Sequence, residues 1–212
     1  MTCCAPARKC LSMPHTEFAP HPTLTPNIAC FWTLEADQLA YNQHAILPDS
    51  YLELVINCGA PLLLETNGTQ AELPSVMLTR LQQAPLKLRA TGDVHLIGVR
   101  LYAWQNRIDL PQSANPIIGL DGIWNDFAQT LQTTFHRNGQ AEAVQTLQQF
   151  VKSLPHHPHP DLSIIQKAGE QLYRTNGMVR MSDLVAQAHL SPRQFERRFK
   201  HFTGLSPNTL AR

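Results

Sequence analysis

Apolar and polar positions change their spacing along the 212-residue chain, and these changes divide it into regions. Between residues 45 and 101, short apolar runs recur between turn signals, and residues 86–90 alternate strictly, which is the pattern of half-buried strands. Asn67-Gly68 adds a strong tight-turn signal. We therefore expect a small antiparallel β-sandwich or barrel, with strands near residues 51–56, 62–65, 75–81, 86–90 and 94–101.

A helical hairpin is expected after the sheet, over residues 121–154. Two apolar stripes at helical spacing lie on either side of a break at Asn138-Gly139: Trp124, Phe127 and Leu131, then Val144, Leu147, Val151 and Leu154. Such stripes either cover a sheet or form the seam of a homodimer. We favour an intramolecular core, because helix stripes usually face one.

The C-terminal region contains one complete amphipathic helix in the run SPRQFERRFKHFTG. Ser191 is the expected N-cap, in a capping box with Gln194, and Pro192 fits the first helical position. Gly204 is the expected C-terminal cap, because glycine readily adopts the left-handed conformation needed there. Ser206-Pro207 then has the form of another helix start.

The two faces of this helix have different chemistry. The expected buried stripe, at i, i+4 and i+7, consists of Phe195, Phe199 and Phe202. The opposite face is cationic and consists of Arg193, Arg197 and Lys200, with Gln194 and His201 beside them. An apolar back and a basic front result.

A shorter helix is expected before it, over residues 183–188, with Ser182 as its cap and His189-Leu190 as the connecting turn. This is the layout of a helix-turn-helix, whose second helix enters the major groove of DNA. There arginine can bond guanine bidentately, glutamine can read adenine, and lysine can hold a phosphate. The candidate DNA-binding residues are Arg193, Gln194, Arg197, Arg198 and Lys200.

The string S-P-R-x-F-x-R-x-F-K-x-x-x-G-x-S-P, beginning at Ser191, closely resembles the first helix-turn-helix of the AraC/XylS-type transcription regulators. The resemblance is strong over residues 161–212, and the stretch ILPDSYLELVINCG more weakly resembles sensor domains found in some of these proteins. It implies a bacterial transcription factor that binds double-stranded DNA, with an effector or dimerisation domain in front. The family's DNA-binding domain has two helix-turn-helix units, and this sequence ends where the helix joining them would begin, so we expect a truncated chain.

These observations predict an α+β protein in two parts. Residues 1–154 form the effector or dimerisation domain, and residues 161–212 form a partial, all-α DNA-binding domain with one helix-turn-helix. Three prolines stiffen the run LPHHPHPDL, so residues 155–160 are expected to be a linker. Residues from Arg180 onward carry a net charge of +4 and the remainder −3, which suits attraction of the C-terminal part to phosphate.

Composition narrows the class of protein further. With 43% hydrophobic and 16% charged residues, the chain has the composition of a folded protein. Because the sequence has neither a long apolar span nor a signal peptide, we expect a cytoplasmic protein with no membrane partner. The cysteines lack paired C-x-x-C spacing, so no disulfide framework, metal site or other cofactor is expected. They are Cys3, Cys4, Cys10, Cys30 and Cys58.

The sheet domain could hold a small-molecule effector, with Trp32 and Trp104 as walls and Glu53 or His95 as polar contacts, although each of these is more often a packing or surface residue. Alternation puts Glu53 opposite the leucines of its strand, on a face that could be solvent.

Two alternatives to a transcription regulator are a cupin-like metal-dependent enzyme and a dimerisation module that does not bind DNA. A cupin-like enzyme would need convergent strand histidines, and the H-x-H motif His157-Pro158-His159 lies in the linker instead. We expect no enzymatic activity.

Overall fold

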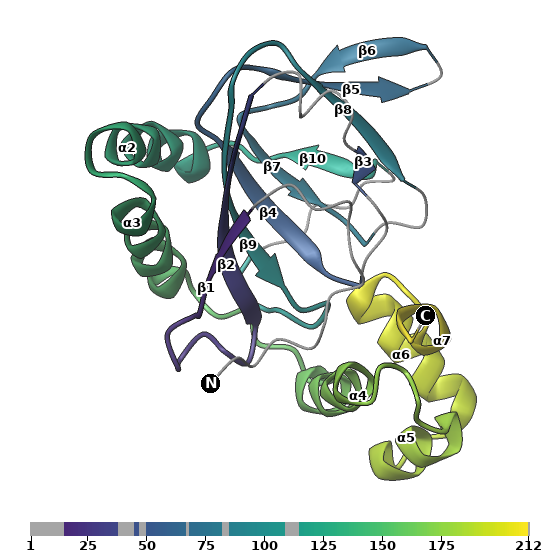
Figure 1. The fold of residues 1–212 in the computed structure, drawn as a ribbon. Helices are drawn as coiled ribbons and strands as arrows, with labels where there is room; N and C mark the ends of the chain where they lie inside the picture. The colour runs from purple at the N-terminus through teal and green to yellow at the C-terminus, as the bar shows by residue number, and fades with distance from the viewer. Residues whose placement is uncertain are drawn as a thin grey trace. The chain divides into compact units, whose positions relative to one another are not determined.

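The computed structural model describes residues 15–37, 45–46, 50–66, 68–81, 85–108 and 115–211. The chain divides into two compact units (Figure 1). The first is a β-sandwich unit from Met1–Tyr102 and Leu110–Leu154, and the second is a helical unit from Ala103–Asp109 and Pro155–Arg212. The helical unit is therefore discontinuous in sequence, because it includes a short segment that directly follows a strand of the sandwich.

The sandwich unit consists of two antiparallel sheets. Six strands form one sheet in the order β1-β2-β9-β4-β7-β10: His15–Phe18, Ile28–Ala36, Val94–Leu101, Leu52–Asn57, Val76–Thr79 and Ile117–Gly119. Four form the other in the order β3-β8-β5-β6: Ala45–Ile46, Leu86–Ala90, Leu62–Thr66 and Thr69–Glu72. Each of the five strands predicted between residues 51 and 101 is present. The prediction did not include β1, β2, β3, β6 and β10. It missed β2, the longest of these, because the residues of this strand are buried on both faces and therefore do not alternate.

Both sheets contribute to one apolar core, as in a sandwich. The six-stranded sheet supplies Leu34, Val55, Met77, Val94, Leu96 and Ile117, and the four-stranded sheet supplies Leu62, Leu88 and Ala90. We call the face of the six-stranded sheet that carries these residues its inner face. In the predicted tight turn Gly68 has φ +79°, and Asn67 lies outside the described residues.

The predicted helical hairpin is confirmed as α2 (Ile123–Asn138) and α3 (Gln140–Ser153). The hairpin covers the outer face of the six-stranded sheet, where Thr33 Oγ1 donates to Gln140 Oε1 over 2.7 Å and the ring of His95 packs on that of Phe135. Val144, Leu147 and Val151 are fully or almost fully buried. The stripe on α3 therefore serves as intramolecular core rather than as an open seam.

Four helices form the rest of the helical unit: α4 (Leu162–Arg174), α5 (Met181–Ala188), α6 (Pro192–Thr203) and α7 (Pro207–Leu210). An antiparallel sandwich with a helical hairpin, followed by helices, confirms the α+β class. The expectation that Ser182 caps α5 is wrong. Asp183 N already donates to Arg180 O over 3.0 Å, so the helix begins two residues earlier than expected, at Met181, and Ser182 Oγ donates to the Asp183 carboxylate instead. Within the described residues, every helix is too short or too polar to span a membrane.

Candidate nucleic-acid interface

Helix α6 has both of the caps that its sequence predicts. Ser191 Oγ accepts from Gln194 N over 3.3 Å, and Gln194 Oε1 accepts from Ser191 N over 3.1 Å, which completes the capping box. At the other end Gly204 adopts φ +82°, and its N–H donates to Lys200 O. Ser206 then caps α7 in the same manner. The limits of α6 are thus fixed by local bonds.

The back of α6 is buried within the helical unit. Phe195 and Phe199 are 1% and 0% exposed, and their rings lie 5.8 Å apart. Phe202 is half-buried and meets the ring of His159 edge-on, with 4.8 Å between centroids. The predicted apolar stripe is confirmed, and one end of it packs on the segment that precedes α4.

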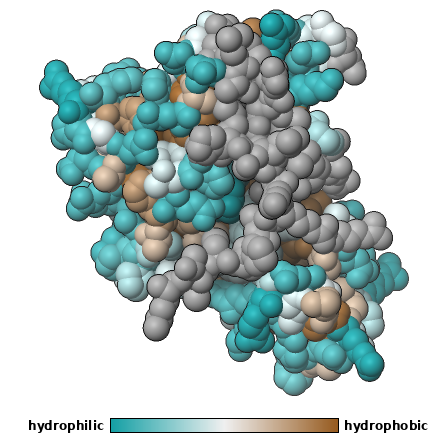
Figure 2. Space-filling view, in the orientation of Figure 1, coloured by the Kyte–Doolittle hydropathy of each residue, from teal (hydrophilic) through white to brown (hydrophobic). Residues whose placement is uncertain are grey.

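The front of α6 carries the cations that the sequence places there. Arg193, Arg197 and Lys200 are all exposed. Counting about 100° per residue, they lie within roughly 60° of one another on the helix. Figure 2 shows a mostly hydrophilic surface over the helical unit in its view. Three exposed cations on one face form a surface that suits the acceptor-rich edges and phosphates of a duplex.

Two of the candidate residues have contacts within the protein. Gln194 belongs to the capping box, so its Oε1 is engaged when the helix is intact. Arg198 Nη1 donates to Asp161 Oδ1 over 2.8 Å, and its side chain is 37% exposed. On the helix Arg198 lies roughly 140° from Arg193, toward the phenylalanine stripe, and this spacing was a signal that sequence reasoning overlooked.

The bond between Arg198 and Asp161 joins α6 to the start of α4. Asp161 precedes α4 directly, and its N–H donates to His159 Nδ1 over 3.1 Å. The segment expected to be a linker therefore contacts α6 through His159, and Asp161, the residue that follows this segment, makes a second contact. Sequence reasoning missed Asp161 because it lies 37 positions before Arg198, and such a separation leaves no local pattern.

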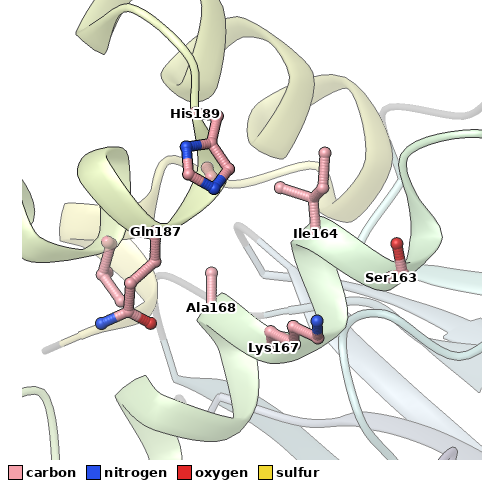
Figure 3. Close-up of a pocket in the computed structure, with 8 residues that line it drawn as sticks. Ser163, Ile164, Lys167, Ala168, Gln187 and His189 are labelled. Atoms are coloured by element: carbon pink, nitrogen blue, oxygen red, sulfur yellow. The ribbon is translucent and has the colours of Figure 1, made fainter.

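The turn between α5 and α6 contains a backbone conformation uncommon for its residue type. His189 ends α5 with φ +52°, in the left-handed region, which histidine enters more often than most side chains do. Next to it lies a groove between α4 and α5 (Figure 3), lined by Ile164, Ala168, Leu184 and Ala188, with Lys167 and His189 exposed beside them. The small alanine side chains leave this space between the two helices.

A second polar site lies on the inner face of the sandwich. Glu53 Oε1 accepts from Arg100 Nε over 2.8 Å, Glu53 Oε2 accepts from Trp32 Nε1 over 2.5 Å, and Arg100 Nη1 reaches Glu17 Oε1 at 3.3 Å. The Glu53 and Arg100 side chains are only 13% and 16% exposed. Glu53 lies on the same side of β4 as the core residue Val55. The expectation that this side could be exposed to solvent is therefore wrong, because it faces the inside of the sandwich. We call Trp32, Glu53 and Arg100 the inner cluster.

Two other residues considered for an effector site lie elsewhere. Trp104 belongs to the helical unit, where its ring meets that of Tyr173. His95 faces the hairpin, against Phe135 and His136. His95 and Arg100 lie on opposite faces of β9, because successive residues of a strand alternate between its two faces.

The described part of the chain holds no group of three or more His, Cys, Asp or Glu side chains placed to bind a metal ion. Cys30 and Cys58 are buried free thiols, and burial raises the pKa of Cys58 to about 12, so at neutral pH it remains protonated. Cys3, Cys4 and Cys10 lie outside the described residues.

Comparisons with known proteins give a family model for part of the chain. Residues 16–117 match a model described as a domain of unknown function, DUF6597. No curated protein matches the chain.

Several solved structures are similar at low identity. ToxT from Vibrio cholerae O395 is 12% identical with a TM-score of 0.48, over 85% of this chain and 77% of that one. The AraC-like transcriptional activator CuxR is 10% identical with a TM-score of 0.28, over 85% and 70%. A putative ethanolamine utilization protein Q from Salmonella typhimurium LT2 is 11% identical with a TM-score of 0.31, over 41% and 67%. At these values, function has to be argued from the chain's own residues.

Proposed function

We propose that this protein is a DNA-binding transcription regulator that reads the major groove with α6. The observation that carries the proposal is the construction of this helix: it is capped at both ends, buried along its phenylalanine stripe, and exposes Arg193, Arg197 and Lys200 on the opposite face. It follows α5 through a short turn, as the second helix of a helix-turn-helix does. The proposed activity is binding, not catalysis.

The exposed cations have different roles in this proposal. Arg193 lies in the first turn of α6, the end that enters the groove, where arginine can bond a guanine edge. Arg197 and Lys200 neutralise phosphates, a contribution that is independent of sequence and falls with salt. Arg198 acts through its bond to Asp161 and positions α6, although the sequence alone suggested that it contacts DNA.

We expect Arg193→Ala to weaken binding to the preferred duplex by about 1–3 kcal/mol and to relax the choice of base at one position. Selection from a randomised pool of duplexes supplies the preferred site, and titrations on single-base variants at two salt concentrations measure the effect. Lys200→Ala should weaken all duplexes alike and reduce the slope of affinity against salt by about one ion.

Arg89→Ala is the matched control, because Arg89 is an exposed arginine on β8 of the sandwich. It should leave affinity and selectivity unchanged. If Arg193→Ala weakened the affinity for every duplex sequence equally, base reading by this residue would be contradicted. If Arg89→Ala weakened DNA binding as much as Arg193→Ala does, only the net charge of the protein would matter.

We further propose that the sandwich responds to a small-molecule effector that contacts the inner cluster. The observation in favour is a set of charged and aromatic side chains on the face that also carries the apolar core. The test is a thermal-shift screen of small carboxylates, amines and sugars against the wild-type chain and the Glu53→Leu/Arg100→Met double variant. A compound that raises the melting temperature of the wild type alone supports the site, and equal shifts in both proteins contradict it.

A further inference from the structure

Residues 103–108, which we call the strap, belong to the helical unit and form a loop that is buried almost throughout. All of its residues except Asn106 are at most 6% exposed. A buried loop has to satisfy its own backbone polar groups. Here the Gln105 side chain does so: its Oε1 accepts from Arg107 N and Ile108 N over 3.0 and 2.8 Å, and its Nε2 donates to Ile108 O over 2.8 Å. The strap is therefore an ordered part of the unit.

Trp104 attaches the strap to α4. Its ring is 1% exposed and meets Tyr173 edge-on, with 5.2 Å between centroids. A Cβ atom added at Gly169 would lie 2.2 Å from two carbons of the indole, well inside the distance of about 3.5–4.0 Å at which carbon atoms normally pack. Glycine weakens the interior of a helix, but at this position it lets the ring lie directly against the helix backbone.

The strap also holds the segment that precedes α4. Asn106 O accepts from His157 N over 2.8 Å. The Arg107 guanidinium donates through Nη2 to His156 Nε2, again over 2.8 Å. The strap thus contacts both α4 and the residues that lead into it.

The back of α6 rests on the same two parts of the helical unit. The ring of Phe202 meets that of His159, and Arg198 bonds Asp161, which directly precedes α4. Helix α4 itself packs on α6. The exposed cations of α6 lie on its opposite face, so these contacts set the direction of that face without occupying it.

We propose that the strap is a working part of the DNA-reading unit and that Trp104 is a positioning residue for α6. This inference rests on the proposed function for its consequence, the selectivity for DNA sequence, while the positioning itself is a property of the helical unit. The indole seats α4 through Gly169, and α4 with the segment before it supports α6. Arg193 is thereby held in one place relative to the unit, as reading a base edge requires.

Hydrogen exchange of the full chain, followed by mass spectrometry, tests the positioning without DNA. Gly169→Ala should speed exchange about tenfold in the peptide covering α4, and should also speed it in the peptide covering α6, because the added Cβ displaces the indole and local opening becomes easier. Without the indole the same change would slow exchange, since alanine is the better helix former.

A second background separates these two effects. Trp104→Leu should by itself speed exchange in α4 about tenfold. Adding Gly169→Ala to Trp104→Leu should then leave exchange unchanged or slow it, because the smaller side chain gives the Cβ room. Trp104→Phe keeps a ring against α4 and should retain most of the protection. Trp124→Leu, which removes an indole from α2 of the sandwich unit, is the control and should leave α4 and α6 unchanged.

DNA titrations provide a readout that distinguishes positioning from unfolding. Gly169→Ala and Trp104→Leu should each lower the ratio of affinities for the preferred and random duplexes about tenfold, and Trp104→Phe should restore most of it. Affinity for the random duplex and its dependence on salt should stay the same, because no charge changes and attraction to phosphates does not require exact placement. Unfolding of the helical unit would instead lower both affinities.

The positioning role is overturned if Gly169→Ala has the same effect on exchange in the wild-type and Trp104→Leu backgrounds, or if α4 responds to these variants and α6 does not. It is also overturned if Arg193→Ala lowers selectivity for DNA while Gly169→Ala and Trp104→Leu leave it intact. If the exchange results hold and no variant of α6 alters DNA binding, the proposed function fails while the positioning of α6 by the strap stands.

Discussion

Replacing Phe199 with alanine should lower the free energy of unfolding of the helical unit by about 3–5 kcal/mol, the cost of deleting a fully buried aromatic ring. Phe199 is 0% exposed and lies between Phe195 and Thr203, which are also buried, so little space is open for the backbone to relax into the cavity. Denaturant titrations followed by circular dichroism, which weights the helices, measure the change.

Lys200→Ala, one position further along the same helix, is the matched control. Its side chain is exposed, so stability should stay within about 0.5 kcal/mol of the wild type. Phe202→Ala should fall between the two, since that ring is half-buried. Equal shifts for Phe199→Ala and Lys200→Ala would mean that the two faces of α6 are assigned wrongly.

Glu53→Leu should destabilise the sandwich unit by about 1–3 kcal/mol, because Trp32 and Arg100 both lose the carboxylate to which they donate, while Arg100 keeps its contact with Glu17. Breaking one side of a largely buried ion pair costs more than the pair itself contributes. Adding Arg100→Met to Glu53→Leu should therefore recover much of the loss. A double-mutant cycle from denaturant melts gives the coupling energy.

Glu72→Leu makes the same chemical change at an exposed position on β6 and should alter stability by less than about 0.5 kcal/mol. If the Glu53→Leu/Arg100→Met variant is as unstable as the sum of its single changes, the two side chains do not act as a pair in solution.

The sequence predicted α6 more completely than it predicted the inner cluster. The limits and faces of α6 were predicted correctly, because they depend on residues at most four positions apart: Ser191 with Gln194, Phe195 with Phe199, and glycine at the C-terminal cap. The strands predicted between residues 51 and 101 were found for a related reason, since alternation follows from the period of the strand itself.

Other features depend on partners that are distant in sequence. Alternation shows that Glu53 and the leucines of β4 lie on opposite faces of the strand. Which of these faces the second sheet covers is decided by strand pairing, and the second sheet covers the face that carries Glu53. The ion pair links Arg198 of α6 to Asp161, which directly precedes α4, and only the packing of α6 on α4 brings the two side chains together.

The sequence by itself determined the five strands between residues 51 and 101, the helical hairpin, and the limits and basic front of α6, because caps, turns and periodic stripes are set by neighbouring residues. Only the tertiary structure decided that Trp104 leaves the sandwich and lies against Gly169, that Arg198 supports α6 from behind, and that Glu53 is enclosed with Arg100. These contacts join residues that are far apart along the chain, and they form because folding buries the surfaces between them, for which no local pattern exists in the sequence.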